Sequence, residues 1–76
     1  MIVSAKNQLV GTVTAIKEGA ENGCVTIDIG GGNIIHATIS TGAIKDLDLK
    51  VGKEACAIIK ASSVMVGICH NGNCKN

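Results

Sequence analysis

Residues 24–40 read Cys-Val-Thr-Ile-Asp-Ile-Gly-Gly-Gly-Asn-Ile-Ile-His-Ala-Thr-Ile-Ser, and this stretch decides the fold class. Apolar and polar residues alternate over 24–29 and again over 34–40, which is the two-residue period of a strand with one buried face. The tetrapeptide Gly-Gly-Gly-Asn between the two runs accepts the backbone angles of a tight turn. The stretch therefore predicts a β-hairpin.

Further strands are predicted on both sides of this hairpin. Residues 9–17 are rich in β-branched side chains and stop at a polar, glycine-containing cluster over 18–23. Residues 53–60 have an apolar centre and predict a fourth strand. Residues 62–68 predict a fifth, separated from the fourth by a kink at Ala-Ser-Ser.

A short helix is predicted between the third and fourth strands, over residues 41–47. Ser40 or Thr41 can cap its start, and Ile44 and Leu47 stand at helical spacing. The order strand, strand, strand, helix, strand, strand predicts an all-β protein, a five-stranded OB-like barrel with one short helix between strands 3 and 4.

The composition predicts a small core that needs support. The chain has 76 residues, enough for one domain, and 46% of them are hydrophobic, but there is no Phe, Tyr or Trp. Aromatic side chains supply much of the burial in small cores, and domains of this size usually depend on a disulfide, a metal or other subunits. We expect oligomerisation.

Charge and cysteine usage exclude several classes of partner. Seven lysines, no arginine and six acidic residues give a net charge of +1 without clustering, so we expect no nucleic-acid partner. No signal sequence and no apolar run long enough for a membrane span are evident, so we expect a cytoplasmic protein with no membrane partner. Its four cysteines are then expected to be free thiols.

Three polar segments are candidates for binding an anion. Residues 4–9 carry a hydroxyl, a lysine and two amides, although a solvated arm is the simpler interpretation of this segment alone. Residues 59–64 place Lys60 and two serines at a strand break with free N–H groups, although an ordinary bend is again simpler. The junction over 40–44 offers the N–H groups of a helix start, for which capping and anion contact are equal alternatives.

Other motifs carry no chemistry. The glycine run over 30–32 lacks the Lys-Ser/Thr pair of a phosphate-binding loop and joins two strands. His36 is expected at the surface. Cys69, His70 and Cys74 have no standard zinc spacing and no evident fourth ligand, so no metal site is predicted. No nucleophile has a base and a carboxylate beside it, and we expect no enzyme activity.

Four segments taken together resemble the molbindin (Mop) family of small molybdate-binding proteins. They are Ser4-Ala5-Lys6-Asn7-Gln8-Leu9, Ala43-Ile44-Lys45-Asp46-Leu47-Asp48-Leu49, Val51-Gly52-Lys53-Glu54 and Ile58-Ile59-Lys60-Ala61-Ser62-Ser63-Val64. The resemblance implies a molbindin domain over residues 1–68, followed by a flexible tail over 69–76. It also implies an OB-like barrel whose subunits exchange strands into dimers and assemble as a hexamer, a trimer of dimers.

The resemblance further implies a binding site for molybdate, with tungstate as a possible substitute, at interfaces between subunits. Ser4 and Lys6 are expected to reach an anion that the neighbouring subunit mainly holds, and Lys6 stands where the family signature usually has Arg. The complete implied set is Ser4, Lys6, Ser40, Ala43, Ile44, Lys60 and Ala61, in which both alanines and the isoleucine offer backbone N–H groups. The implied function is intracellular molybdenum storage or homeostasis, and the alternative is a regulatory or structural protein-interaction module of the same fold.

Overall fold

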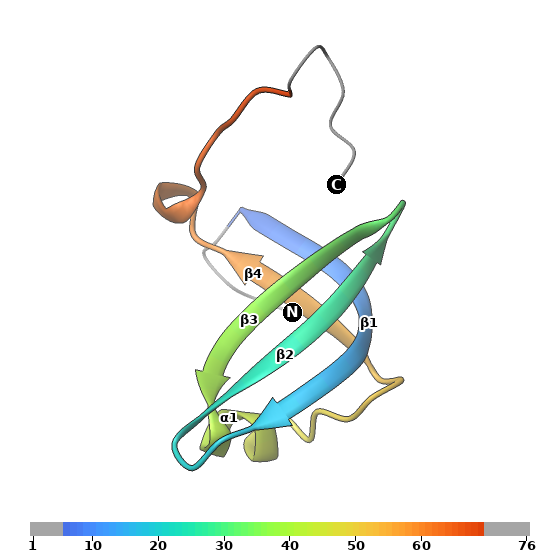
Figure 1. Cartoon of the computed structure of the whole chain (residues 1–76), viewed down its shortest axis with the longest axis vertical. Helices are drawn as coiled ribbons and strands as arrows, with labels where there is room; N and C mark the ends of the chain where they lie inside the picture. Colours follow the sequence, from blue (N-terminus) through green and yellow to red (C-terminus); the bar gives the residue numbers. More distant parts are fainter. Residues whose placement is uncertain (1–5, 70–76) are drawn as a thin grey trace.

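A computed structural model describes residues 6–69 of the chain. Its elements, in order, are β1 (Asn7–Glu18), β2 (Asn22–Gly30), β3 (Asn33–Ser40), α1 (Thr41–Asp46), β4 (Glu54–Ile59) and a single 3-10 turn, η1 (Ala61–Ser63). Figure 1 shows the strands curled around a common interior, with α1 at one end. The predicted all-β class with one short helix between the third and fourth strands is confirmed. No helix within residues 6–69 is long and apolar enough to cross a membrane.

The four strands form one antiparallel sheet in the order β3-β2-β1-β4. The predicted hairpin is its β2–β3 half, and the glycine run makes the connection: Gly30, Gly31 and Gly32 have φ angles of 92°, 64° and 80°. These angles are open to glycine and strained for other residues. The sheet bends strongly at a bulge in β1 between Val13 and Ala15, because a bulge adds local twist.

The interior of the curl holds a small aliphatic core. Its buried residues are Val13, Val25, Ile27, Ile44 and Ala57, four of which come from strands and one from α1. No aromatic ring is available to enlarge it. The predicted shortage of core is therefore visible in the described residues, where Met65, Val66 and Ile68 are also more than 90% exposed.

Helix α1 is closed at both ends by hydrogen bonds. At its start the Ser40 hydroxyl accepts from the N–H of Ala43 at 3.0 Å, which confirms Ser40 as the N-cap. At its end Asp48 N–H donates to Lys45 O and Leu49 N–H to Ile44 O, at 3.0 and 3.1 Å. This is the Schellman arrangement, and Asp48 occupies its left-handed position with φ 52°.

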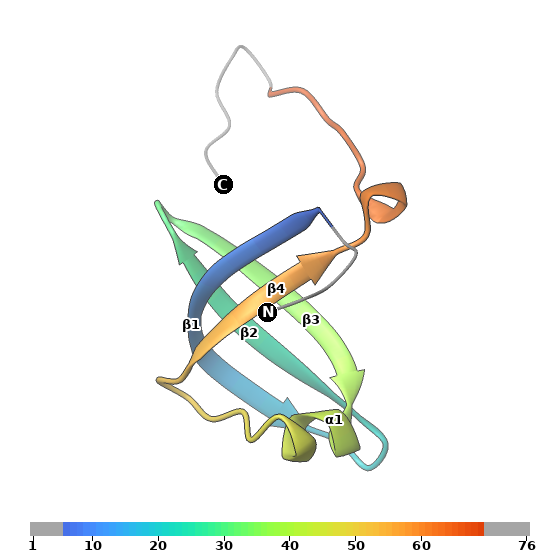
Figure 2. The same ribbon diagram turned by 180° about the vertical axis from the view of Figure 1, so that it is seen from behind.

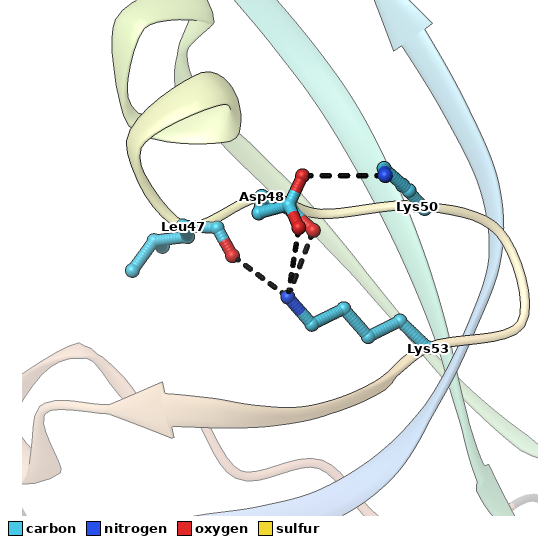
Figure 3. Close-up of polar contacts among 4 residues, drawn as sticks. All are labelled: Leu47, Asp48, Lys50 and Lys53. Carbon is cyan, nitrogen blue, oxygen red and sulfur yellow. Dashed lines mark hydrogen bonds and ion pairs between the residues drawn. The ribbon is translucent and has the colours of Figure 1, made fainter.

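The loop after α1 is held by Lys53, as Figure 3 shows. The Lys53 ammonium donates to the carbonyls of Leu47 and Asp48, at 3.1 and 2.9 Å, and lies 3.8 Å from the Asp48 carboxylate. Lys50 approaches the same carboxylate at 3.5 Å. Two backbone hydrogen bonds with Val13 anchor this part of the chain to β1, so the loop is tied to both the helix end and the sheet.

The single chain differs from two expectations of the sequence. The fifth strand predicted over 62–68 is absent: η1 occupies the first part, and the chain beyond Ser63 is extended without a ladder partner. A strand needs a neighbour to pair with, and no free sheet edge lies beside this segment (Figures 1 and 2). The four cysteines are not all free either, because Cys69 is disulfide-bonded whereas Cys24 and Cys56 carry free thiols. The predicted tail beyond Cys69 lies outside the described residues.

Candidate functional site

One set of the predicted ligands lies where β1 begins and β4 ends. The last pair of the β1–β4 ladder is Asn7 opposite Ile59. Lys6, just before β1, and Lys60, just after β4, therefore lie at the same end of the sheet. We call Lys6, Lys60 and Ala61 the lysine group; all three are exposed. No acidic side chain pairs with either lysine among residues 6–69. Like charges at the same end of a ladder disfavour each other, and an anion bound between them would offset that repulsion.

A second set lies at the junction of β3 and α1. We call Ser40, Ala43 and Ile44 the helix group. The Ala43 N–H is taken by the Ser40 hydroxyl, which as an acceptor keeps its own proton free to donate. Ile44 is only 3% exposed because its side chain fills the core, so it can offer no more than backbone atoms. This group supplies hydrogen-bond donors without a lysine of its own.

The two groups stand at opposite ends of one chain. Asn7, beside the lysine group, is the first residue of β1, while Glu18, its last, reaches the β2 end that pairs with Ser40. Twelve residues of strand lie between them, a path of about 36 Å along the backbone at roughly 3.3 Å per residue. Figures 1 and 2 both show η1 and α1 at opposite ends of the sheet. The structure therefore does not bring the predicted ligands together within one chain, and Ser4 lies outside the described residues.

The other lysines and candidate metal ligands in the described structure belong to neither group. Lys50 and Lys53 are engaged with Asp48, on the loop that follows α1. His36 is exposed, as predicted, and its ring nitrogen Nδ1 pairs with the Thr26 hydroxyl at 3.3 Å. No cluster of three metal-ligating side chains occurs among residues 6–69, and of the trio considered in the sequence, His70 and Cys74 lie outside that range.

Two features of the junction between β3 and α1 were not identified from the sequence. Thr41 donates its hydroxyl to Gly19 O at 2.9 Å and its N–H to Glu21 O at 2.8 Å, which ties the β1–β2 turn to the junction. Neither bond could be predicted, because the partners are about twenty residues away. The N–H of Gly42, one of the four helix-start donors that lack an intrahelical partner, makes no bond outside α1 among the described residues.

An open groove of about 810 Å³ runs along the inside of the curled sheet. The edges of β3 and β4 form its two sides, with Val25 and Ile27 at its base and Leu47 and Leu49 at one end. Figure 1 has β3 in front and β4 behind, and Figure 2 reverses them, so the two edges face each other across the opening. Each edge carries unpaired backbone groups, which are a template for another strand.

Comparison with known proteins identifies close relatives. A family model described as "TOBE domain" matches residues 3–66. A protein of Haemophilus influenzae named "Probable molybdenum-pterin-binding protein" is 59% identical over 68 residues, which cover 90% of this chain and 99% of the relative.

Two solved structures are similar to this chain in fold and in sequence. MopII from Clostridium pasteurianum superposes with a TM-score of 0.81 at 38% identity and covers 86% of this chain and 97% of its own. The protein described as the cytoplasmic molybdate-binding protein ModG, solved with molybdate bound, has the same TM-score at 43% identity. It covers 86% of this chain, which spans 46% of ModG.

Proposed function

This chain belongs to the molbindin family of TOBE-domain proteins, and from that premise we propose that it binds molybdate between subunits of a homo-oligomer for intracellular molybdenum storage. The observation that carries the proposal is the division of the ligands into a lysine group and a helix group at opposite ends of the chain. Charge stands at one end and directed donors at the other. A site with both needs two chains.

The chemistry of the two groups suits a tetrahedral dianion. Lys6 and Lys60 provide charge, Ser4 and Ser40 provide hydroxyls, and Ala61 provides a backbone N–H group, while Ala43, whose N–H bonds the Ser40 hydroxyl, and Ile44 contribute the backbone of the helix start. Charge-assisted hydrogen bonds of this kind are about twice as strong as neutral ones and gain further where subunits exclude water. Tungstate has the same charge and shape and is the expected substitute, while sulfate is separated from both by size.

The oxyanion, rather than an aromatic cofactor, is the ligand that this composition favours. The name of the Haemophilus influenzae relative refers to a molybdenum-pterin, and a flat heteroaromatic ring is normally held by stacking on aromatic side chains. This sequence has no Phe, Tyr or Trp and no Arg. We propose the role of a binding protein without catalytic activity, placed in the cytoplasm as ModG is described to be.

Strand exchange supplies the second chain. The groove lined by β3 and β4 is open, and the extended residues 64–68 of the same chain do not line it and expose Met65, Val66 and Ile68. We propose that this segment enters the groove of a second copy and becomes its fifth strand, which completes the barrel over residues 1–68. The resulting dimers assemble as a hexamer, a trimer of dimers.

Calorimetric titration of the full chain with molybdate, tungstate and sulfate tests the function. We expect saturable, stoichiometric binding of molybdate and tungstate, weak or absent binding of sulfate, and a melting temperature that rises with molybdate, because a ligand bound only to the folded oligomer stabilises it. A titration in which none of the three anions binds would overturn the proposal.

A further inference from the structure

The segment over residues 64–68 has the pattern of a strand, although it is unpaired in the single chain. Its β-branched residues Val64, Val66 and Ile68 occupy alternate positions, so they would share one face of a strand. In the single chain Val66 and Ile68 are more than 90% exposed. Burial of this face requires a sheet edge on which the segment can pair.

The edge of β4 is the nearest edge along the chain. Strand β4 ends at Ile59, and the next residue, Lys60, keeps the extended angles φ −63° and ψ 133°. If the strand continued to Ala61, only the dipeptide Ser62-Ser63 would separate it from the segment. Two residues are the commonest length of a hairpin connection. The spacing along the chain therefore allows the segment to fold back on β4 as a hairpin.

The register of such a hairpin also suits the core. A two-residue turn pairs the residues on either side of it, which here are Ala61 and Val64. Ala61 stands an even number of positions after Ala57, which is 7% exposed and belongs to the core, and such positions share a face of a strand. Val64 and the other two β-branched residues of the segment would therefore face the core, whereas a shift of one residue would turn them to solvent.

The dipeptide Ser62-Ser63 does not suit this turn. Two-residue hairpin turns of type I′ need a positive φ at both central residues, and Asn-Gly and Gly-Gly accept these angles. The β2–β3 hairpin shows the requirement in the same chain, because its turn residues Gly31 and Gly32 have φ angles of 64° and 80° and the residues on either side of them pair. The Cβ atom of serine disfavours the same angles.

Residues 61–63 form η1 instead of a hairpin turn. The hydrogen bonds of η1 run from the N–H of Ser63 to Lys60 O at 2.9 Å and from the N–H of Val64 to Ala61 O at 3.3 Å. Figures 1 and 2 both show the chain beyond η1 running away from the sheet. The segment is therefore held off the edge of its own β4.

We infer that Ser62 and Ser63 select strand exchange over closure of the single chain. The segment over 64–68 is in register for its own β4 but does not turn back, so it pairs in the groove of a second copy. The inference rests on the strand exchange of the proposed function and deepens it, because it names the residues that decide between a closed monomer and an exchanged oligomer. A closed monomer keeps its lysine group and its helix group at opposite ends of the sheet and binds no molybdate.

The test replaces the two serines by a pair that accepts the turn. The double variant Ser62→Asn/Ser63→Gly supplies the favoured type I′ pair at unchanged chain length. The matched control is Ser62→Ala/Ser63→Ala, which changes the same two positions to residues that avoid positive φ. Sedimentation of each full-length protein reports its mass, hydrogen exchange reports the protection of the amides of residues 64–68, and calorimetric titration reports the binding of molybdate.

We expect Ser62→Asn/Ser63→Gly to sediment as a single chain of 7.7 kDa, to protect the amides of residues 64–68, and to lose stoichiometric binding of molybdate. Wild type and the control should both sediment as the same oligomer, protect the same amides and bind molybdate alike. The inference is wrong, and the proposed function stands, if Ser62→Asn/Ser63→Gly keeps the mass of the wild type, if it is a monomer with those amides unprotected, or if the control is a monomer as well. A wild type that is monomeric, or that binds no molybdate, would overturn the proposed function itself.

Discussion

Gly23 and Ile44 show how closely the helix is fitted to the sheet at the scale of single residues. A Cβ atom on Gly23 would lie 2.5 Å from the end of the Ile44 side chain and 3.1 Å from Lys17 O. Both neighbours are packed, so Gly23→Ala should destabilise the protein by about 1–3 kcal/mol through overpacking. Gly42→Ala is the matched control, because its nearest neighbour is 4.0 Å away and alanine favours the helix by roughly 0.5–1 kcal/mol. Urea unfolding midpoints that move the same way for both variants would contradict this account.

Lys6 is the residue at which the chain departs from the signature of its family, and its replacement tests the lysine group. An arginine offers two parallel donors to an oxyanion where lysine offers a point charge, so Lys6→Arg should bind molybdate roughly twofold to tenfold more tightly. Lys6→Met should bind more weakly. The control Lys50→Met also removes one positive charge, but at the Asp48 loop. Equal loss of affinity in both methionine variants would show that net charge alone is responsible.

For single residues, the sequence predicted chemical roles better than it predicted contacts between residues. Ser40 as a helix cap follows from residue type and position, and the structure confirms it. His36 at the surface follows from strand alternation. The sequence alone does not show that Thr41 makes different contacts from Ser40. Thr41 bonds to Gly19 and Glu21, and only the folded sheet brings these residues close to it. The direct contacts to an anion stay predictions.

Among the elements, the end of α1 depends on a residue in an unfavourable conformation. Asp48 has φ 52°, where a side chain costs about 1 kcal/mol relative to glycine. Its ion pairs with Lys50 and Lys53 are exposed, and such pairs contribute about 0–1 kcal/mol. Asp48→Gly should therefore leave stability unchanged or raise it slightly, whereas Asp48→Val should lower it by roughly 1–2 kcal/mol. Thermal melting of the two variants checks the order, and a valine variant as stable as the glycine variant would contradict it.

The elements themselves follow well from the sequence where their signals are local. Alternation and the glycine run predicted the β2–β3 hairpin, and the capping residue with Ile44 predicted α1. The segment over 62–68 is also predicted to form a strand, yet it forms none in the single chain. A local sequence pattern indicates that a segment is able to pair as a strand. The pairing itself requires a neighbouring strand.

At the scale of the whole molecule, the single chain exposes two apolar surfaces, a groove and an extended segment. The groove between β3 and β4 is lined mainly by aliphatic side chains, and residues 64–68 are an extended apolar segment. Val66→Asp should convert an oligomer into a monomer, because Val66 is 93% exposed in the single chain and would carry a charge into the groove of its partner. Val51→Asp is the control at another exposed valine, outside this segment. Sedimentation showing the same mass for both variants would contradict strand exchange.

The central claim is that one molybdate ion is held by groups from different copies of the chain. Native mass spectrometry of the full-length protein, with and without molybdate, reports the number of subunits and the number of bound oxyanions in one measurement. We predict hexamers that carry molybdate, and no molybdate on monomers, because the lysine group and the helix group of one chain lie at opposite ends of its sheet. Monomers that retain molybdate, or hexamers that take up none, would contradict it.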